Sequence, residues 1–594
     1  MCFNPMNKQQ CASLFIWGIC FFTLVACSQR ELPLSERIRF NQLGFYPSEE
    51  KVAVVYADSI GNQPFSIRNL ATNKVVFTGV SSGLRTSSFS DKKTSVLSFT
   101  GLTAAGEYRI EMPGIGQSYP FAVRESILQD VALAGLKAFY YQRASTPIEE
   151  PYAGAWNRPA GHPDDSVMVH PSAASPNRPA GTIIASPKGW YDAGDYNKYI
   201  VNSGFTVGVL LSLYEDFPDA VKQQNAHIPE SGNTTPDLLD EVYWNIEWML
   251  TMQDPADGGV YHKLTGAEFE GFIKPVDCRK QRYVVAKSVT AALDFAASMA
   301  QASRVYSGFE ADYPGLAAKT LAAARFAFNW ALKNPEVLYR QRAMNENFDP
   351  DVTTGEYGDR SATDEFFWAS VELYITTGEA SYLKTAAEYA PDTYTLPTWG
   401  RVNGLGQWTL IRHAGTRQEA QTLAAQAREQ LLTYADSASQ HLETAPYAAP
   451  YGRQAKDFFW GCNSDAASNQ GITFLYAWLL TQNKKYLTNA LHNMDYILGR
   501  NATGFCYITG WGSKSPVNPH HRLSASDELA DPIPGFLVGG PNPGKQDNCE
   551  YPSDIPDESY TDVTPAYAAN EIAINWQSLF TYFSTALDVS LRKN

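Results

Sequence analysis

Residues 237–253, DLLDEVYWNIEWMLTMQ, decide the fold class of most of this chain. Their apolar side chains recur every three or four residues, which is the spacing of one face of an α-helix. Loops rich in Gly, Pro, Trp and Asp separate this block from others like it. Helix pairs with long loops at one end predict an all-α toroid, although an α-solenoid gives the same pattern. Comparable blocks cover residues 288–306, 321–334, 364–377, 418–441, 469–481, 487–498 and 570–589.

A different pattern precedes the helices. Between residues 36 and 124, short β-prone runs such as 51–56 alternate with Gly, Asn and Pro turns. Residues 106–112 alternate polar and apolar side chains, as a half-buried strand does. Roughly seven short strands in about 90 residues predict an immunoglobulin-like sandwich. We therefore expect a multidomain protein, with an all-β sandwich at 36–124 followed by an all-α domain at 127–592.

The composition excludes several classes of protein. The 594 residues include 13 Trp, 33 Tyr and 30 Phe, whereas disordered chains are poor in aromatic residues. With 47 basic and 62 acidic side chains the net charge is −15, which argues against a nucleic-acid partner. A neutral substrate fits this balance, and so many rings suit a packed core or a sugar-binding cleft. We expect a monomer.

The N-terminus carries an export signal. Lys8 precedes an uncharged apolar run at residues 11–26, which is short for a membrane span. The run ends in Leu24-Val25-Ala26-Cys27, which resembles a bacterial lipobox. In such lipoproteins the cysteine becomes the first residue of the mature chain and carries the lipid. We expect residues 1–27 to be the leader and the protein to be anchored to the outer membrane through Cys27; the alternative is an ordinary signal peptide.

Two carboxylates stand three residues apart in GWYDAGDYNKY, residues 189–199. Asp192 and Asp195 flank a turn in which Gly194 permits close approach of another backbone segment. A carboxylate here can activate water while its neighbour helps to hold that water. An Asx turn or a calcium loop would give the same pattern.

A third carboxyl group stands near the C-terminus. Glu571 lies in YTDVTPAYAANEIA, residues 560–573, at the predicted head of the last helix, where a glutamate is also a routine first-turn residue. A loop further upstream contains NPHHR, residues 518–522. Its two histidines could be metal ligands, but no third ligand is spaced nearby. His520 and Arg522 suit hydrogen bonds to sugar hydroxyls or to a carboxylate better.

Together these stretches resemble the signatures of glycoside hydrolase family 9. PDLLDE at 236–241, DGGVYHK at 257–263 and TGEYGD at 354–359 resemble further family signatures. IRFNQLGF at 38–45 resembles the opening strand of the immunoglobulin-like domain found in one subgroup. The resemblance covers nearly the whole mature chain, with its motifs in the family's order.

The resemblance implies an (α/α)6 barrel that hydrolyses β-1,4-glucosidic bonds with inversion. By position, Asp195 matches the catalytic base, Asp192 the residue that positions water, and Glu571 the general acid. His520 and Arg522 match residues that bind substrate near the cleavage point. Inversion needs one protonated and one ionised carboxyl group, roughly 6.5–9.5 Å apart. Burial beside Tyr567 would raise the pKa of the acid.

The sequence also suggests which aromatic residues line the cleft, but it does not rank them. We include Tyr567, Trp190 and Tyr196 among the substrate-binding residues because they flank the carboxyl motifs. Further candidates are Trp399, Trp408, Trp460 and Trp511.

The chain departs from the family pattern at two points. Gln577 stands where the last signature ends in Asn, and residues 142–145 and 160–162 lack the cysteines that hold a structural zinc in related proteins. We therefore expect no zinc and no catalytic cofactor, while acidic loops leave structural calcium open. The remaining cysteines form no CxxC pair, so a zinc ribbon and a dense disulfide framework are excluded. They are Cys278, Cys462, Cys506 and Cys549.

Two kinds of function stay open beside the principal one. We expect an endo-β-1,4-glucanase on cellulose-like, mixed-linkage or xyloglucan chains. An exo-acting β-glucosidase or exo-β-glucosaminidase of the same family is the alternative among enzymes. A glycan-binding surface lipoprotein without activity is the alternative from another class, although every catalytic position is present.

Overall fold

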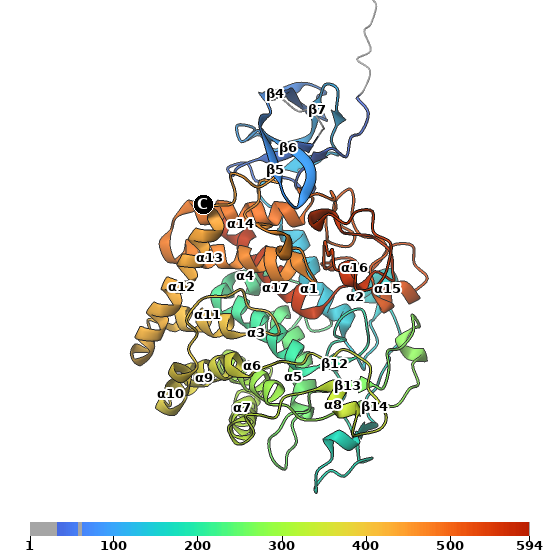
Figure 1. Ribbon diagram of the computed structural model, residues 1–594, viewed down its shortest axis with the longest axis vertical. Coiled ribbons are helices and arrows are strands. Elements are labelled where there is room, and N and C mark those ends of the chain that lie inside the picture. The colour runs from blue at the N-terminus through green and yellow to red at the C-terminus, as the bar shows by residue number, and fades with distance from the viewer. Residues whose placement is uncertain (1–31, 57–61, 593–594) are drawn as a thin grey trace, which may run out of the picture.

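The N-terminal strands form two antiparallel sheets packed face to face above the helical domain (Figure 1). The computed structural model describes residues 32–56 and 62–592. One sheet has the order β1-β2-β6-β5 and the other β4-β3-β7-β8, with β9 paired to β7. Between them Phe45 packs edge-on against Phe99 and Phe121. The strands are β1 (Ile38–Arg39), β2 (Val52–Tyr56), β3 (Pro64–Asn69), β4 (Val75–Val80), β5 (Ser82–Ser87), β6 (Ser90–Ser98), β7 (Gly106–Met112), β8 (Gly116–Gln117) and β9 (Phe121–Val123).

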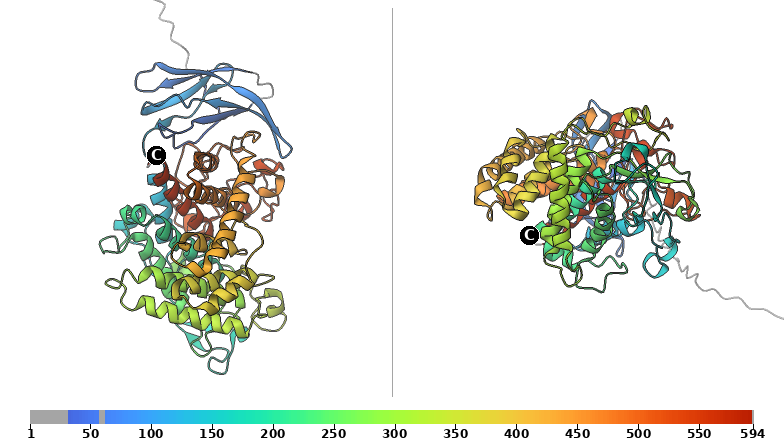
Figure 2. Two further views of the ribbon diagram at one scale, coloured as in Figure 1. Left: turned by 90° about the vertical axis from the view of Figure 1, so that its left-hand side faces the viewer. Right: turned by 90° about the horizontal axis from the view of Figure 1, so that it is seen from below.

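The rest of the chain is a ring of helices in two layers (Figures 1 and 2). The inner layer runs in order α3, α6, α9, α11, α13 and α17, and packing of α17 against α3 closes it. The outer layer comprises α1, α5, α7, α10, α12 and α14. The bounds are α1 (Gln129–Gln142), α3 (Ile200–Asp216), α5 (Asp237–Thr251), α6 (Val289–Tyr306), α7 (Leu316–Lys333), α9 (Thr363–Thr377), α10 (Ala380–Glu388), α11 (Asn403–His413), α12 (Gln421–Ser439), α13 (Asn469–Thr481), α14 (Lys484–Ile497) and α17 (Ile574–Arg592).

This architecture confirms the predicted fold class: an immunoglobulin-like sandwich followed by an (α/α)6 barrel. The shorter helices lie in the loops between the layers. They are α2 (Glu150–Ala153), α4 (Pro218–Gln223), α8 (Gln341–Asn345), α15 (Arg522–Ser526) and α16 (Tyr567–Asn570).

Four barrel helices do not appear among the predicted blocks: α1, α3, α10 and α11. Helix α3 is buried on every side from Ile200 to Leu213, so it has no polar face and shows no amphipathic period. The first turn of helix α11 contains Gly404 and Gly406, which disfavour a helix locally. Gly404 abuts the ring of Pro397, and Gly406 abuts Phe367, so the space for a larger side chain is absent there.

A small sheet also lies in the barrel domain and was not predicted. Its order is β11-β10-β14-β13-β12, and its last strand leads directly into α3. The sheet therefore carries residues 189–199 to the mouth of the barrel. The strands are β10 (Val167–Val169), β11 (Ile183–Ile184), β12 (Lys198–Tyr199), β13 (Lys263–Gly266) and β14 (Arg282–Val284).

Buried polar contacts join the sandwich to the barrel. Tyr46 donates a 2.6 Å hydrogen bond to Asp588 Oδ1 at the end of α17. The fully buried Arg500 pairs with Asp495 at 2.7 Å and donates to the carbonyl oxygen of Val52 in β2. Unpairing such a buried charge is costly, so these contacts fix how the two domains dock.

Two further features bear on the predictions. The four cysteines within the described residues are free thiols, so none of them forms a disulfide. Between residues 32 and 56 and between 62 and 592, no helix combines the length and apolarity needed to cross a bilayer. Cys27 and the predicted leader lie outside the described residues.

Candidate active site

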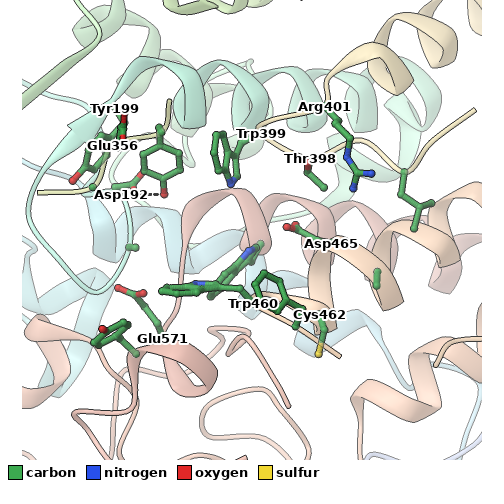
Figure 3. A pocket seen from close by; sticks show the side chains of 18 of the residues that line it. Asp192, Tyr199, Glu356, Thr398, Trp399, Arg401, Trp460, Cys462, Asp465 and Glu571 are labelled. Carbon is green, nitrogen blue, oxygen red and sulfur yellow. Dashed lines mark hydrogen bonds between the residues drawn. The ribbon is translucent and has the colours of Figure 1, made fainter. Parts of the chain in front are cut away.

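A cavity of about 1300 Å³ opens at the mouth of the barrel (Figure 3). It is formed largely by the segments that precede the inner helices, among them the one before α3. Three of the predicted residues with carboxyl groups, Asp192, Asp195 and Glu571, line it together. The aromatic residues of its wall are Tyr199, Phe269, Tyr357, Tyr394, Trp399, Tyr434, Phe459, Trp460, Tyr567 and Trp576.

Asp192 is held by donors from two other parts of the barrel. Its Oδ1 accepts a 2.7 Å hydrogen bond from Asn202 on α3, and its Oδ2 accepts one of 2.7 Å from Tyr357. The backbone carbonyl of Asp192 accepts from the N–H of Ile574, the first residue of α17. Hydrogen bonds therefore connect the Asp192 turn to α3 and to the first residue of α17, the two helices whose packing closes the barrel.

Asp195 is oriented from within its own turn. Its Oδ2 accepts hydrogen bonds from Asn197 Nδ2 at 2.5 Å and from the Asn197 N–H at 3.3 Å. Tyr199 donates to the same oxygen at 3.3 Å. Three donors on one carboxyl oxygen fix the orientation of the side chain.

Glu571 reaches the site from an extended segment rather than from a helix. The sequence placed it at the head of the last helix, but α16 ends at Asn570 and α17 begins only at Ile574. Between the two helices, Glu571 forms a parallel β-bridge with His520, and Ala573 forms an antiparallel β-bridge with Ala193. This short extended segment therefore lies against the Asp192–Asp195 turn, which the helical prediction did not foresee.

Gly194 is the point where the two carboxyl segments meet. Its N–H donates a 3.2 Å hydrogen bond to Glu571 Oε1. A Cβ atom on this residue would lie 2.2 Å from the carbonyl oxygen of His520 and 3.0 Å from Glu571 Oε1. The predicted close approach is thus confirmed, and only glycine allows it.

Burial and proximity shift the pKa values of two of the three carboxyl groups. Burial, followed by the negative charge of Asp195, raises the pKa of Glu571 well above its usual range. The same two causes raise the pKa of Asp192 to about 8, against the opposing hydrogen bonds from Asn202 and Tyr357. Both Glu571 and Asp192 therefore bind a proton more tightly than a free carboxyl group does.

His520 and Arg522 both border the cavity, as predicted. His520 Nδ1 donates to the Thr564 carbonyl at 2.7 Å, and burial lowers the pKa of the ring to about 4. The imidazole is therefore neutral, with Nε2 left as an acceptor. Arg522 donates to the carbonyl of Gly194 at 2.9 Å and lies over the ring of Phe272.

The adjacent His521 points away from the cavity. Its Nε2 lies 3.1 Å from Gln142 Oε1, and the side chain is almost fully buried. The two neighbouring histidines therefore do not converge on one metal ion.

The structure separates the predicted aromatic residues into two groups. Tyr567, Trp399 and Trp460 line the cavity, whereas Trp408 and Trp511 do not. Trp190 is fully buried against Phe139, and its ring nitrogen faces Glu241, so its prediction as a substrate-binding residue is wrong.

Tyr196 also lies outside the cavity wall. Its ring packs against Tyr191 and His162, and its hydroxyl donates to the Ile273 carbonyl at 2.8 Å. The prediction that it binds substrate is wrong for the same reason: a position beside a carboxyl motif fixes closeness in sequence but not the direction of the side chain.

Sequence reasoning missed several residues of the site. Tyr357 belongs to the TGEYGD stretch, which was noted only as a motif, although its hydroxyl contacts Asp192. Arg401 and Asp465 line the cavity as well and belong to none of the noted motifs. Asn202 lies inside the unpredicted helix α3, which explains why it was overlooked.

One group of potential metal ligands occurs among the described residues. Atoms of His162, Glu270 and Cys278 lie within 4.8 Å of one another. Burial raises the pKa of the Cys278 thiol to about 12. Burial together with the cationic side chains of Arg282, Lys198 and Arg158 lowers the pKa of His162 to about 2. The positive charges of these three side chains disfavour a bound cation, and we assign no metal to this group. The absence of zinc stays a prediction.

A second buried acidic group is a carboxyl pair between α6 and α9. Asp294 and Glu365 are fully buried, and all four of their side-chain oxygens lack a hydrogen-bond partner among the described residues. Burial and nearby carboxylates raise the pKa values of both groups well above the usual range. Structural calcium stays a prediction.

Fold and site together define a class of protein. A protonated carboxyl group and a second carboxyl group meet in a long, aromatic-lined cleft at the mouth of a helical barrel, as acid–base hydrolysis of a glycosidic bond requires. Residues 129–584 match the family described as Glycosyl hydrolase family 9, and residues 34–117 match the Cellulase N-terminal ig-like domain. The chain belongs to glycosyl hydrolase family 9.

Individual relatives are similar over nearly the full length. A xyloglucan-specific endo-β-1,4-glucanase of Bacteroides ovatus is 54% identical over 96% of this chain and 97% of its own length. Endoglucanase D of Acetivibrio thermocellus is 31% identical over 92% of this chain and 82% of its own. A solved structure described as Bacteroides ovatus GH9 superposes with a TM-score of 0.90 at 52% identity, covering 94% of this chain and 100% of the other.

Proposed function

We propose that this protein is an inverting endo-β-1,4-glucanase of polysaccharide degradation and that xyloglucan is its preferred substrate. The observation that carries the endo assignment is the cavity of about 1300 Å³, which continues past the carboxyl groups to Arg401 and Asp465. Such a cleft exceeds what one sugar ring needs and suits a chain cleaved internally. The xyloglucan preference is supported by the relative that is 54% identical and carries that specificity in its name.

In the proposed reaction Glu571 acts as general acid and Asp195 as general base. The carboxyl proton of Glu571 passes to the glycosidic oxygen as the bond from that oxygen to the anomeric carbon breaks. A water molecule attacks the anomeric carbon from the opposite face and gives its proton to Asp195. The protonated state of Glu571 follows from its raised pKa, and the three donors on Asp195 keep the accepting group in place.

The supporting residues have distinct proposed roles. Asp192, fixed by Asn202 and Tyr357, borders the water that attacks and helps to position it. His520 Nε2 accepts a hydrogen bond from a sugar hydroxyl close to the bond that is cleaved. Tyr567 and Trp460, whose ring centroids are 5.7 Å apart, offer faces on which sugar rings stack.

Product analysis tests this proposal. On xyloglucan, carboxymethylcellulose and mixed-linkage glucan, viscosity should fall early while few new reducing ends appear. Proton NMR of the first products should show the α-anomer from the β-linkage. Release of monosaccharide alone would favour the exo-acting alternative, and retention of the β-anomer would exclude the inverting mechanism.

We further infer that the protein is exported and lipid-anchored through Cys27. The inference rests on Lys8, the apolar run at residues 11–26 and the sequence Leu24–Cys27. An alkyne-labelled fatty acid fed to producing cells should label the wild type and not a Cys27→Ser variant. Equal labelling of both would contradict it, and protease treatment of intact cells would show which membrane face the barrel occupies.

A further inference from the structure

The cleft contains a carboxyl group that the proposed reaction does not use. Asp465 lies in a π-helical turn, Asn463–Ser468, which leads into α13. π-Helical turns inside helices often occur at functional sites. Asp465 Oδ1 is shielded from solvent and accepts a hydrogen bond from no described residue.

The neighbours of Asp465 hold it in this position. Asn463 donates to the Val538 carbonyl at 3.0 Å, and Ser464 donates to the Trp576 carbonyl at 3.1 Å. Both side chains are fully buried. Because the residues before Asp465 are anchored in the barrel, its carboxyl group projects into the cleft from a rigid support.

A cationic side chain faces Asp465 across the cleft. Figure 3 shows Arg401 and Asp465 approaching from opposite sides, with Thr398 close by. Burial raises the pKa of Asp465 to about 7, and the positive charge of Arg401 acts against that rise. Within the described residues no ion pair joins the two side chains, although both line the same cavity.

This arrangement is suited to a neutral sugar. A hydroxyl group can accept a hydrogen bond from a guanidinium and donate one to a carboxylate at the same time. A buried acceptor without a partner also penalises ligands that lack the matching donor. Figure 3 places the pair beyond Trp399 and Trp460 when viewed from Asp192 and Glu571, hence away from the bond that is cleaved.

We infer that Asp465 and Arg401 form a distal subsite that binds hydroxyl groups of a β-glucan chain and makes cleavage depend on chain length. The inference rests on the proposed glucanase function. Asp465 acts as a specificity-determining residue and takes no part in the bond-breaking step.

A chain-length series tests this subsite. Kinetics on β-1,4-gluco-oligosaccharides of three to six rings and on xyloglucan are compared for the wild type, Asp465→Ala and Arg401→Gln. The longest substrates should lose about 10- to 100-fold in kcat/KM, the range for one hydrogen bond to a charged group, while the shortest cleaved substrate loses less than about twofold. Asp392→Ala, which removes an exposed carboxyl group that does not line the cleft, should match the wild type at every length.

Binding without turnover separates this inference from the proposed function. Calorimetry with cellohexaose on the Glu571→Gln variant, with and without Asp465→Ala, should show about 10-fold weaker binding in the double variant. Equal losses at all chain lengths, or no loss in kinetics and calorimetry alike, would overturn the subsite. If the wild type cleaved no β-glucan, the proposed function would be contradicted. The calorimetry would still show whether Asp465 contributes to binding of the glucan chain.

Discussion

Asp195 and Glu571 face one cleft from two segments that are built differently. Asp195 belongs to a turn that supplies its own donors, three of them to a single carboxyl oxygen. Glu571 comes from an extended segment far along the chain and accepts one backbone N–H, from Gly194. Burial with few donors raises the pKa of Glu571, while the donors on Asp195 hold its carboxyl group in one orientation. Identical chemical groups thus acquire opposite roles from their surroundings.

Removing either carboxyl group should give the largest effect. Asp195→Asn and Glu571→Gln should each lower kcat on a natural glucan by on the order of 10³-fold, because proton transfer to or from the reacting atoms is lost. Initial rates of reducing-end release measure this, with unfolding temperatures as the control for folding. A variant that keeps a tenth of the wild-type rate would contradict the proposed assignment.

The difference between the two groups should become visible with an activated leaving group. A 2,4-dinitrophenyl β-cellobioside departs without protonation, so Glu571→Gln should recover most of its rate on this substrate. Asp195→Asn should stay impaired, because attack by water is still required. For each variant, the loss of kcat relative to the wild type is measured on the aryl substrate and on cellohexaose. The ratio of the two variants' losses is then compared between the substrates. Equal recovery would mean that the proposed roles are shared or reversed.

The junction of the two segments can be disturbed without touching a carboxyl group. Gly194→Ala would place a Cβ atom 2.2 Å from the His520 carbonyl oxygen, so the segments must move apart. A displacement of about 1 Å at a reacting group can cost about 10²-fold, and we expect a loss of kcat of that order. Gly232→Ala is the matched control, because its Cβ would meet no atom within 4 Å. Unchanged activity in Gly194→Ala would show that the close approach is dispensable.

A smaller effect is expected on the pH profile. Glu571 must be protonated to act, so kcat/KM falls as pH rises through its pKa. Arg522 lowers that pKa by stabilising the carboxylate, so Arg522→Gln should move the alkaline limb to higher pH, whatever the loss in absolute rate. Arg522→Lys retains the charge and should leave the limb closer to that of the wild type. A shift of the limb to lower pH in Arg522→Gln would contradict the electrostatic account of the acid.

Much of the fold was predictable because it follows from local periodicity. Helices α7 and α12 bury one face, with buried side chains every three or four residues, and strand β7 alternates as expected for one buried side. Helix α3 was not predictable in this way, since burial on every side removes the period. The sandwich was recognisable from strand spacing, whereas its docking through Arg500 depends on buried contacts between distant segments.

The site shows the same division more sharply. The sequence alone determined which carboxyl groups to consider, because Asp192, Gly194 and Asp195 form one turn and Glu571 stands in a motif of its own. Only the tertiary structure decided that Gly194 touches Glu571 and that Trp190 faces the core. It also placed Asp465 opposite Arg401 in the cleft. Residue type and spacing fix local conformation, but burial, partners and therefore protonation are set by segments hundreds of residues away.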